Sequence, residues 1–392
     1  MKRIPMIIVV LALVLPIRVH ALECTDCHGE VNIDKYKQSI HGRNEMTCAD
    51  CHGYFQVTAD GHGKPGPVDC SMCHEDSGTA VNGSIHASHG TFNAVSCFEC
   101  HGNHYILSDI PKIGREYRIM MNEMCSRCHI LSETHPFSKT QRQFVKSYFT
   151  SVHSTTIQKS GLIFSATCVD CHGSHNVYPE EEDKSLMHRQ KIHDTCGTCH
   201  QGAASDFMAG IHGEALKNGN PDAPTCIDCH EKHYIQHAHM KSSQIYPVNI
   251  PKTCLKCHGK TELIDKYNWS PLTEENYGDS YHGAALKLGD ISVAHCASCH
   301  MAHKILSHTN PQSPTHWDNL SETCGVCHTS DDPVNIDNLG KIHVLTAKEL
   351  HPISKLIANL YRILIVATLG FFIAFISSDL YRNILNRRNK KG

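Results

Sequence analysis

The stretch that decides the fold is TCVDCHGSH, Thr167 to His175, in which two cysteines separated by two residues are followed at once by a histidine. The pattern Cys-x-x-Cys-His occurs eleven times in the 392 residues, and its copies use all 22 cysteines. The cysteine pairs are Cys24 and Cys27, Cys48 and Cys51, Cys70 and Cys73, Cys97 and Cys100, Cys125 and Cys128, Cys168 and Cys171, Cys196 and Cys199, Cys226 and Cys229, Cys254 and Cys257, Cys296 and Cys299, and Cys324 and Cys327. The chain is therefore built around whatever this motif binds.

This spacing is the attachment site of c-type haem. The two thiols add to the vinyl groups of the porphyrin, and the adjacent histidine becomes the proximal ligand of the iron. A single copy could equally be half of a zinc site or a redox dithiol, but neither these nor a disulfide scaffold places a histidine after every second cysteine. We therefore expect eleven copies of haem c. The predicted proximal ligands are His28, His52, His74, His101, His129, His172, His200, His230, His258, His300 and His328.

The motif spacing also shows an internal duplication. Four motifs that begin at Cys97 recur 128 or 129 residues later, from Cys226 onward, and three more closely spaced motifs precede them. The predicted domains are a signal peptide (1–21), a three-haem region (22–90), two four-haem units (91–210 and 211–345), a linker (346–360), a transmembrane helix (361–381) and a basic tail (382–392).

Each haem can also take a second histidine, and positions that recur across the duplication are the better candidates. The predicted distal ligands are His41, His62, His86, His104, His153, His175, His188, His212, His233, His282, His303, His316 and His343. Sequence order does not assign a distal histidine to its haem. We expect histidines that do not recur, such as His193 and His295, to be solvated or to bond haem propionates.

Both ends of the chain carry apolar segments. Lys2 and Arg3 precede an apolar run that ends before Ala21, which is typical of a cleaved signal peptide and predicts export to the periplasm. Near the other end, Tyr361 and Tyr381 bracket nineteen residues, enough to cross a bilayer. Basic residues follow directly, so we expect a single-pass inner-membrane protein with its bulk in the periplasm and its C-terminus in the cytoplasm.

Composition bounds the fold and the partners. The apolar residues are too few for an ordinary core, and no sustained alternation predicts a sheet. The expected fold class is mostly α and irregular, with short helices and loops wrapped around a chain of haems. The predicted exported part has 28 basic and 38 acidic residues, which argues against nucleic-acid binding and favours basic partner surfaces.

The motifs resemble those of multihaem c-type cytochromes over essentially the whole exported region. The series S-x-H-G (Ser39 to Gly42), CxxCHG-x-H (Cys168 to His175) and T-C-G-x-C-H (Thr195 to His200) is similar to repeats of membrane-anchored, quinone-linked members. That resemblance implies electron transfer in respiration, periplasmic redox partners and a polytopic, b-type cytochrome-like membrane subunit that reacts with quinone. His351, before the apolar helix, would then be an interface residue, a quinone-site neighbour or a ligand shared with that subunit.

Two classes of function remain open. The first is electron transfer between the quinone pool and periplasmic carriers or terminal reductases, with no catalytic residue in this chain. The second is a multihaem reductase of a small nitrogen or sulfur oxyanion, which needs one haem with an open coordination position. All eleven motifs end in histidine, and this favours the first class. An extracellular cytochrome filament conflicts with the membrane helix.

Overall fold

The computed structural model describes residues 24–54, 61–64, 66–87, 94–106, 114–131, 138–271, 273–328 and 352–389. The predicted signal peptide, His343 and His351 lie outside these ranges. The chain divides into two compact units. Unit 1 comprises Met1–Phe137 and Thr156–Pro179, and unit 2 comprises Ser138–Thr155 and Glu180–Gly392.

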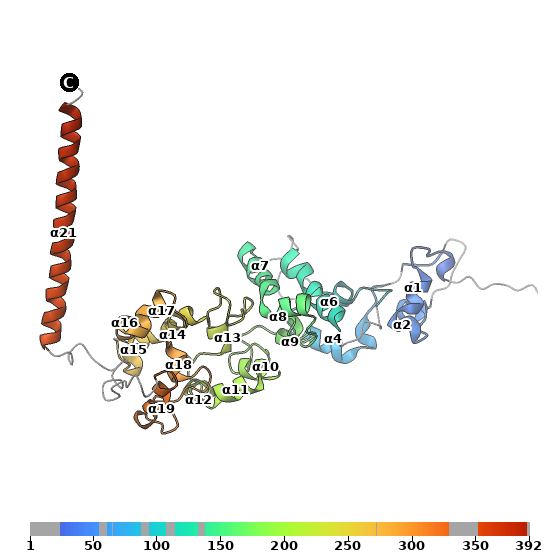
Figure 1. Cartoon of the computed structure of the whole chain (residues 1–392). Helices are drawn as coiled ribbons and strands as arrows, with labels where there is room; N and C mark the ends of the chain where they lie inside the picture. The colour runs from blue at the N-terminus through green and yellow to red at the C-terminus, as the bar shows by residue number, and fades with distance from the viewer. Residues whose placement is uncertain are drawn as a thin grey trace, which may run out of the picture. The chain divides into compact units, whose positions relative to one another are not determined.

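Unit 1 consists of short helices and helical turns joined by irregular segments (Figure 1). Its longest helix is α6, which packs against the motif helix α9. The elements are η1 (Cys24–Asp26), α1 (Ile33–Gln38), α2 (Ile40–Arg43), α3 (Cys48–His52), η2 (Cys70–Met72), α4 (Glu75–Asn82), α5 (Cys97–His101), α6 (Arg115–Ser126), η3 (Arg127–Leu131), η5 (Thr156–Ser160) and α9 (Cys168–His172).

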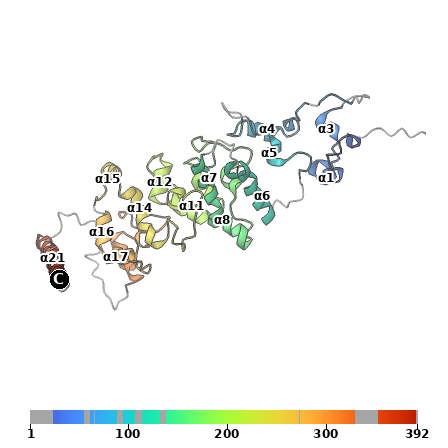
Figure 2. The same ribbon diagram turned by 90° about the horizontal axis from the view of Figure 1, so that it is seen from above.

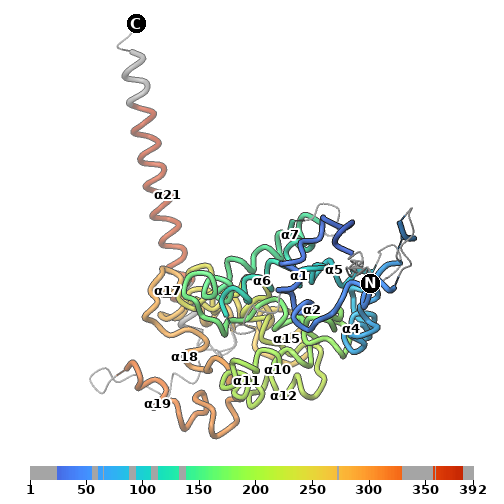
Figure 3. Tube along the Cα trace, turned by 90° about the vertical axis from the view of Figure 1, so that its right-hand side faces the viewer, coloured from blue at the N-terminus to red at the C-terminus, as the bar shows by residue number. Residues whose placement is uncertain are grey.

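Unit 2 has the same character. Helices α10, α11 and α12 pack in succession, as the tube in Figure 3 shows. The elements are α7 (Lys139–Lys146), η4 (Ser147–Thr150), α8 (Val152–Thr155), α10 (Ile192–Gly197), α11 (Gln201–Met208), α12 (Ile211–Lys217), α13 (Cys226–His230), η6 (Pro247–Asn249), α14 (Ile250–His258), α15 (Thr261–Tyr267), α16 (Thr273–Asp279), α17 (Tyr281–Lys287), α18 (Cys296–His300), η7 (Trp317–Asn319), α19 (Leu320–Gly325) and α21 (Pro352–Asn389).

The expected fold class is confirmed. Apart from single bridge residues at Ser39 and Gly61, the described part of the chain is helical or irregular, with no β-sheet.

The protein's own hydrophobic core is small. Among the described residues only six apolar side chains are buried, and three of them, Phe207, Leu216 and Ala223, form one cluster in unit 2. Large apolar side chains such as Met72, Phe98 and Val326 are exposed to more than half of their surface. A chain that packs so little of its own apolar surface needs another apolar body in its interior, and a porphyrin is such a body.

Helix α21 differs from all the other described elements in length and composition. Its segment Asn359–Arg382 contains an 18-residue window with a mean hydropathy of 2.2, and none of that window is buried. These 24 residues would extend about 36 Å, enough to cross the hydrocarbon core of a bilayer. Figure 2 views this helix nearly along its axis. The predicted span, 361–381, falls inside this segment.

Candidate haem sites

We number the Cys-x-x-Cys-His motifs 1 to 11 in chain order, from Cys24 to Cys324. Each even-numbered motif forms a five-residue helix of its own, namely α3, α5, α9, α13 and α18. All five helices begin with a capping box, in which the residue before the first cysteine and the residue before the second cysteine bond each other. This local chemistry starts the helix at the first cysteine and holds both thiols and the histidine on one short turn.

The residue after the proximal histidine ends each of these helices with a positive φ. Glycine takes this position in motifs 2, 4 and 6, at Gly53, Gly102 and Gly173. In motifs 8 and 10 it is Glu231 and Met301, both with φ 68° and with ψ of 174° and 170°. Only glycine adopts that region without strain. The same backbone turn is therefore kept in all five motifs, even in the two where the residue has a side chain that disfavours a positive φ.

Nine proximal histidines each face a second histidine within the same unit. The ring centroids lie 5.8 to 6.3 Å apart. In unit 1 the pairs are His28 with His62, His74 with His41, His52 with His104, His129 with His86, and His101 with His175. In unit 2 they are His200 with His153, His258 with His212, His230 with His303, and His328 with His282.

This spacing fits an iron atom between the two rings. An imidazole nitrogen binds a transition metal at about 2 Å, so two rings on opposite sides of one metal have centroids about 6 Å apart. In the pair of His28 and His62 the Nε2 atoms face each other at 3.5 Å, slightly less than the distance of about 4 Å that two such bonds in line span. No cluster of three or more His, Cys, Asp or Glu side chains that could hold a bare metal ion occurs in the described ranges. Two histidines leave an iron four ligands short, and a porphyrin supplies four nitrogens.

Eight of the nine facing histidines come from two kinds of place in the sequence, and the ninth, His62, follows motif 2 and faces His28 of motif 1. For odd motifs 3, 5, 7, 9 and 11, the partner precedes the motif. Except for His86, which lies in a turn, it is the second residue of a short helix, as in Ser280-Tyr-His282 before motif 11. For even motifs 2, 4 and 8, the partner is the last histidine of the pattern CxxCHxxH in the next even motif, that is, in motifs 4, 6 and 10. His104, which follows motif 4, faces the proximal histidine of motif 2.

One backbone hydrogen bond ties the two kinds of place together. The amide of the residue before the odd-motif partner donates to the carbonyl of the second residue after the last histidine of a CxxCHxxH stretch, at 2.8 Å in all four instances. The four bonds run from Ile40 to Ile106, Ile85 to Val177, Val152 to Ile235 and Ile211 to Ile305. The repeat seen in the sequence is thus a repeat of hydrogen bonding that positions two histidines at once.

Glycine follows three of these histidines because backbones cross there. A Cβ added to Gly42, Gly213 or Gly283 would overlap the carbonyl oxygen of Tyr36, Phe207 or Tyr277, respectively. The other two histidines of this kind are followed by Ala87 and by Ser154, which is fully buried. The S-x-H-G pattern therefore indicates a close backbone contact as well as the position of a facing histidine.

Cysteines of consecutive motifs are neighbours in space. First-cysteine thiols lie within hydrogen-bonding reach of each other in five pairs, which join motifs 1 with 2, 3 with 4, 5 with 6, 7 with 8 and 9 with 10. These pairs are Cys24 with Cys48, Cys70 with Cys97, Cys125 with Cys168, Cys196 with Cys226, and Cys254 with Cys296. Even motifs approach the next odd motif through the second cysteine, as Cys51 does Cys73 and Cys299 does Cys324. Within each unit the attachment points therefore follow one another in chain order.

Burial keeps several of the paired histidines neutral. It lowers the pKa of His212 to about 4, and it also lowers the pKa values of His230 and His258. A neutral imidazole has the free nitrogen lone pair that binds iron. These sites therefore present the ligand form that haem iron takes.

The other predicted distal histidines have the following neighbours. His188 lies 3.4 Å from Asp183, and His316 lies 3.5 Å from Asp318. His233 packs on Phe144, with ring centroids 4.6 Å apart. His343 is outside the described residues. The ligand assignments as a set remain a prediction.

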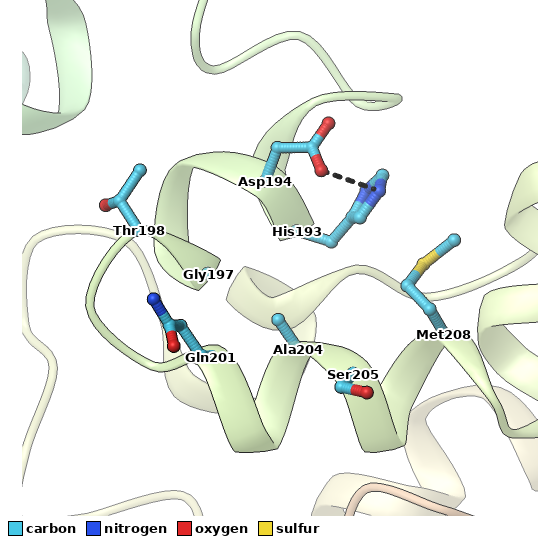
Figure 4. Close-up of a pocket in the computed structure, with 8 residues that line it drawn as sticks. All are labelled: His193, Asp194, Gly197, Thr198, Gln201, Ala204, Ser205 and Met208. Carbon is cyan, nitrogen blue, oxygen red and sulfur yellow. Dashed lines mark ion pairs between the residues drawn. The ribbon is translucent and has the colours of Figure 1, made fainter.

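A cavity of about 470 Å³ lies beside motif 7, between α10 and α11 (Figure 4). Its lining includes Gly197 and Thr198, the two residues between the cysteines of the motif, together with His193 and Asp194. The His193 ring and the Asp194 carboxylate lie 3.3 Å apart. This is an ionisable pair next to a haem attachment site, whereas the sequence alone places His193 among the histidines expected to be solvated or to bond propionates.

One comparison with known proteins finds a match to a protein family. Residues 40–130 match the family model described as cytochrome c3. The matched stretch holds motifs 2 to 5 and the partner histidines His41, His86 and His104. No solved structure matches the chain.

Proposed function

Because the chain is a multihaem c-type cytochrome, we propose that it carries eleven haems c and transfers electrons between the quinone pool and periplasmic carriers or terminal reductases in respiration. Haem iron supplies the chemistry by alternating between the ferric and ferrous states. The residues of this chain bind the haems, fix their order and close their coordination positions.

The observation that carries the proposal is the order of the thiol contacts. Cys70 lies against Cys97, and Cys100 approaches Cys125, so the attachment points of motifs 3, 4 and 5 follow one another without a gap. Cys254 and Cys296 repeat this contact in unit 2. Haems attached at neighbouring thiols would have porphyrin edges close to each other. Such an arrangement supports electron transfer from each haem to the next.

The facing histidines favour electron transfer over oxyanion reduction. A reductase needs an iron with one open position, as well as acid–base groups beside it. The cavity at motif 7 offers such groups in His193 and Asp194. Its proximal histidine, His200, nevertheless faces His153, which would occupy the position that an oxyanion needs.

Membrane attachment through α21 and a link to quinone complete the proposal. The apolar segment Asn359–Arg382 supports a single-pass anchor. A single helix cannot by itself enclose a quinone, so the proposal includes a polytopic, quinone-reactive subunit of the b-type cytochrome kind. Gly370 and Ala374 lie four residues apart on α21 and offer a small-residue face for packing against it.

The proposal is tested by counting haems and reading their spin state. Intact mass together with a haemochrome assay should give eleven covalent haems per chain. Absorbance and electron paramagnetic resonance spectra should show low-spin ferric iron. A count of eight or fewer would refute one haem per motif, and a high-spin signal that rapidly binds nitrite or carbon monoxide would favour the reductase.

A further inference from the structure

Motif 10 lacks a charge that the other even motifs share. The residue before the second cysteine is acidic in motifs 2, 4, 6 and 8 and is a serine, Ser298, in motif 10. The four acidic residues are Asp50, Glu99, Asp170 and Asp228. Since this position belongs to the capping box of each motif helix, the structure fixes its side chain closely.

In motifs 2, 4, 6 and 8, two hydrogen bonds hold the carboxylate in place. In motif 8 the backbone N–H and the hydroxyl of Thr225 donate to Asp228 Oδ2 at 2.6 and 2.8 Å. The same two bonds occur in motifs 2, 4 and 6, at 2.6 to 2.9 Å. A full negative charge is thus held two residues before each proximal histidine.

In motif 10 the same position is neutral. The backbone N–H of His295 donates to the hydroxyl of Ser298 at 3.1 Å, so the capping box persists without a carboxylate. The Nδ1 atom of His295 is buried and has no hydrogen-bond partner. The residues from Cys296 to Lys304 include no acidic side chain that could replace the missing charge.

Motif 6 gives an intermediate case. Its carboxylate, Asp170, forms an ion pair with Arg118 at 2.6 Å. The guanidinium offsets the negative charge where it is held. Motifs 2, 4 and 8 have no such ion pair with this carboxylate among those seen in the described residues.

A fixed negative charge near an iron stabilises the ferric state, because reduction removes one positive charge from the centre. Loss of that charge makes reduction easier. Solvent weakens the effect at these exposed carboxylates but does not change its sign.

We propose that Ser298, in place of the carboxylate, gives the haem at motif 10 the least negative reduction potential among the haems on the five capped motif helices. Between the two capped motif helices of unit 2, an electron then rests preferentially at the motif that begins at Cys296 rather than at the one that begins at Cys226. This inference rests on the proposed function, because it requires a haem at each motif. Ser298 acts as a positioning residue, through the charge that it omits.

The experiment is a potentiometric titration of the full-length holoprotein, followed by haem absorbance. Ser298→Asp should move the share of one haem from the less negative part of the curve to more negative potentials. Ser298→Asn, which introduces a neutral side chain of nearly the same size as aspartate, should leave the curve unchanged. If Ser298→Asp does not fold, His295→Thr combined with it rebuilds the capping box of motif 8.

A reciprocal variant tests the same charge at another motif. Asp228→Asn keeps a hydrogen-bond acceptor but removes the charge, and it should shift one haem's share to less negative potentials. The inference would be overturned if the titration curve were unchanged in both Ser298→Asp and Asp228→Asn. It would also be overturned if the haem whose potential changes in Ser298→Asp had titrated at the most negative potentials in the wild type. Haem content measured on the same samples separates the two ideas, since a chain with fewer haems would refute the proposed function instead.

Discussion

His282 and His316 are both predicted distal ligands, but the structure surrounds them differently. The ring of His282 faces His328 at 6.2 Å, whereas His316 lies beside Asp318. We predict that His282→Ala converts one haem to a high-spin state, because it opens the coordination position opposite His328. His316→Ala should leave the spin state unchanged.

Electron paramagnetic resonance of the two ferric variants checks this prediction, with haem content as the control for loading. A high-spin signal of one haem in His316→Ala, or its absence in His282→Ala, would contradict the assignment.

The strained backbone after two proximal histidines gives a second residue-scale prediction. Met301 adopts a φ of 68° that only glycine takes freely, and about half of its side chain is exposed. Met301→Gly should raise the free energy of unfolding by about 1 kcal/mol, because relief of the strain outweighs the added entropy of the unfolded chain.

The matched control is Gly102→Ala, at the equivalent turn of motif 4, where φ is 74° and a Cβ would meet no atom within 4 Å. That change should lower the free energy of unfolding by a similar amount. The midpoints of urea unfolding, followed by far-ultraviolet circular dichroism, measure both effects. Equal midpoints for Met301→Gly and the wild type would show that the turn carries no strain.

The sequence predicts the attachment residues but not the histidine pairing, and the reason lies in the period of the repeat. The 128- to 129-residue duplication relates His188 to His316 and so selects both. The structure shows a shorter repeat of two motifs, in which the same turn places Tyr246 where the others have His188 and His316. A turn that also accommodates tyrosine does not require an iron ligand there, and the ligation of His188 and His316 stays a prediction. The patterns S-x-H and CxxCHxxH, taken as two separate series, contain seven of the nine facing histidines, whereas His62 and His212 fit neither pattern.

Among the helices, those at the even motifs follow directly from sequence chemistry. A threonine or serine before the first cysteine and an acid before the second form a capping box, and this predicts a helix start at each such motif. The positions of the remaining short helices depend on contacts with distant segments, such as the bond from Ile211 to Ile305. Those contacts depend on which histidines face each other, and the local sequence does not encode this pairing.

The helix contact behind S-x-H-G gives an element-scale prediction. A Cβ at Gly283 would overlap the backbone oxygen of Tyr277, so Gly283→Ala should separate α17 from α16 and displace His282. The expected result is a high-spin signal of one haem and a lower unfolding midpoint. Gly278→Ala, in α16, is the matched control, since a Cβ there meets nothing within 4 Å. If Gly283→Ala kept a low-spin spectrum and the wild-type midpoint, the close contact would not position His282.

At the scale of the whole molecule, the apolar segment of α21 is the candidate membrane anchor. We predict that a chain ending after residue 351 carries the same number of haems as the full chain and stays in the aqueous phase. It should not accept electrons from a quinol analogue, because the partner subunit would no longer be held. Detergent phase partition and stopped-flow reduction measure the two properties. Reduction of the truncated chain as fast as that of the membrane-bound form would refute the partner subunit.

The direction in which the partner histidines lie along the chain sets a timetable for assembly. His41 precedes His74 and His86 precedes His129, so the odd sites from motif 3 onward have both rings available as soon as their own motif has been synthesised. An even site must wait, since His104 emerges 52 residues after His52. In five of the nine pairs the partner histidine is thus already present when its motif emerges, and the other four pairs are completed by sequence that follows. We therefore expect maturation to be vectorial, with later segments of the chain completing the histidine pairs of earlier ones.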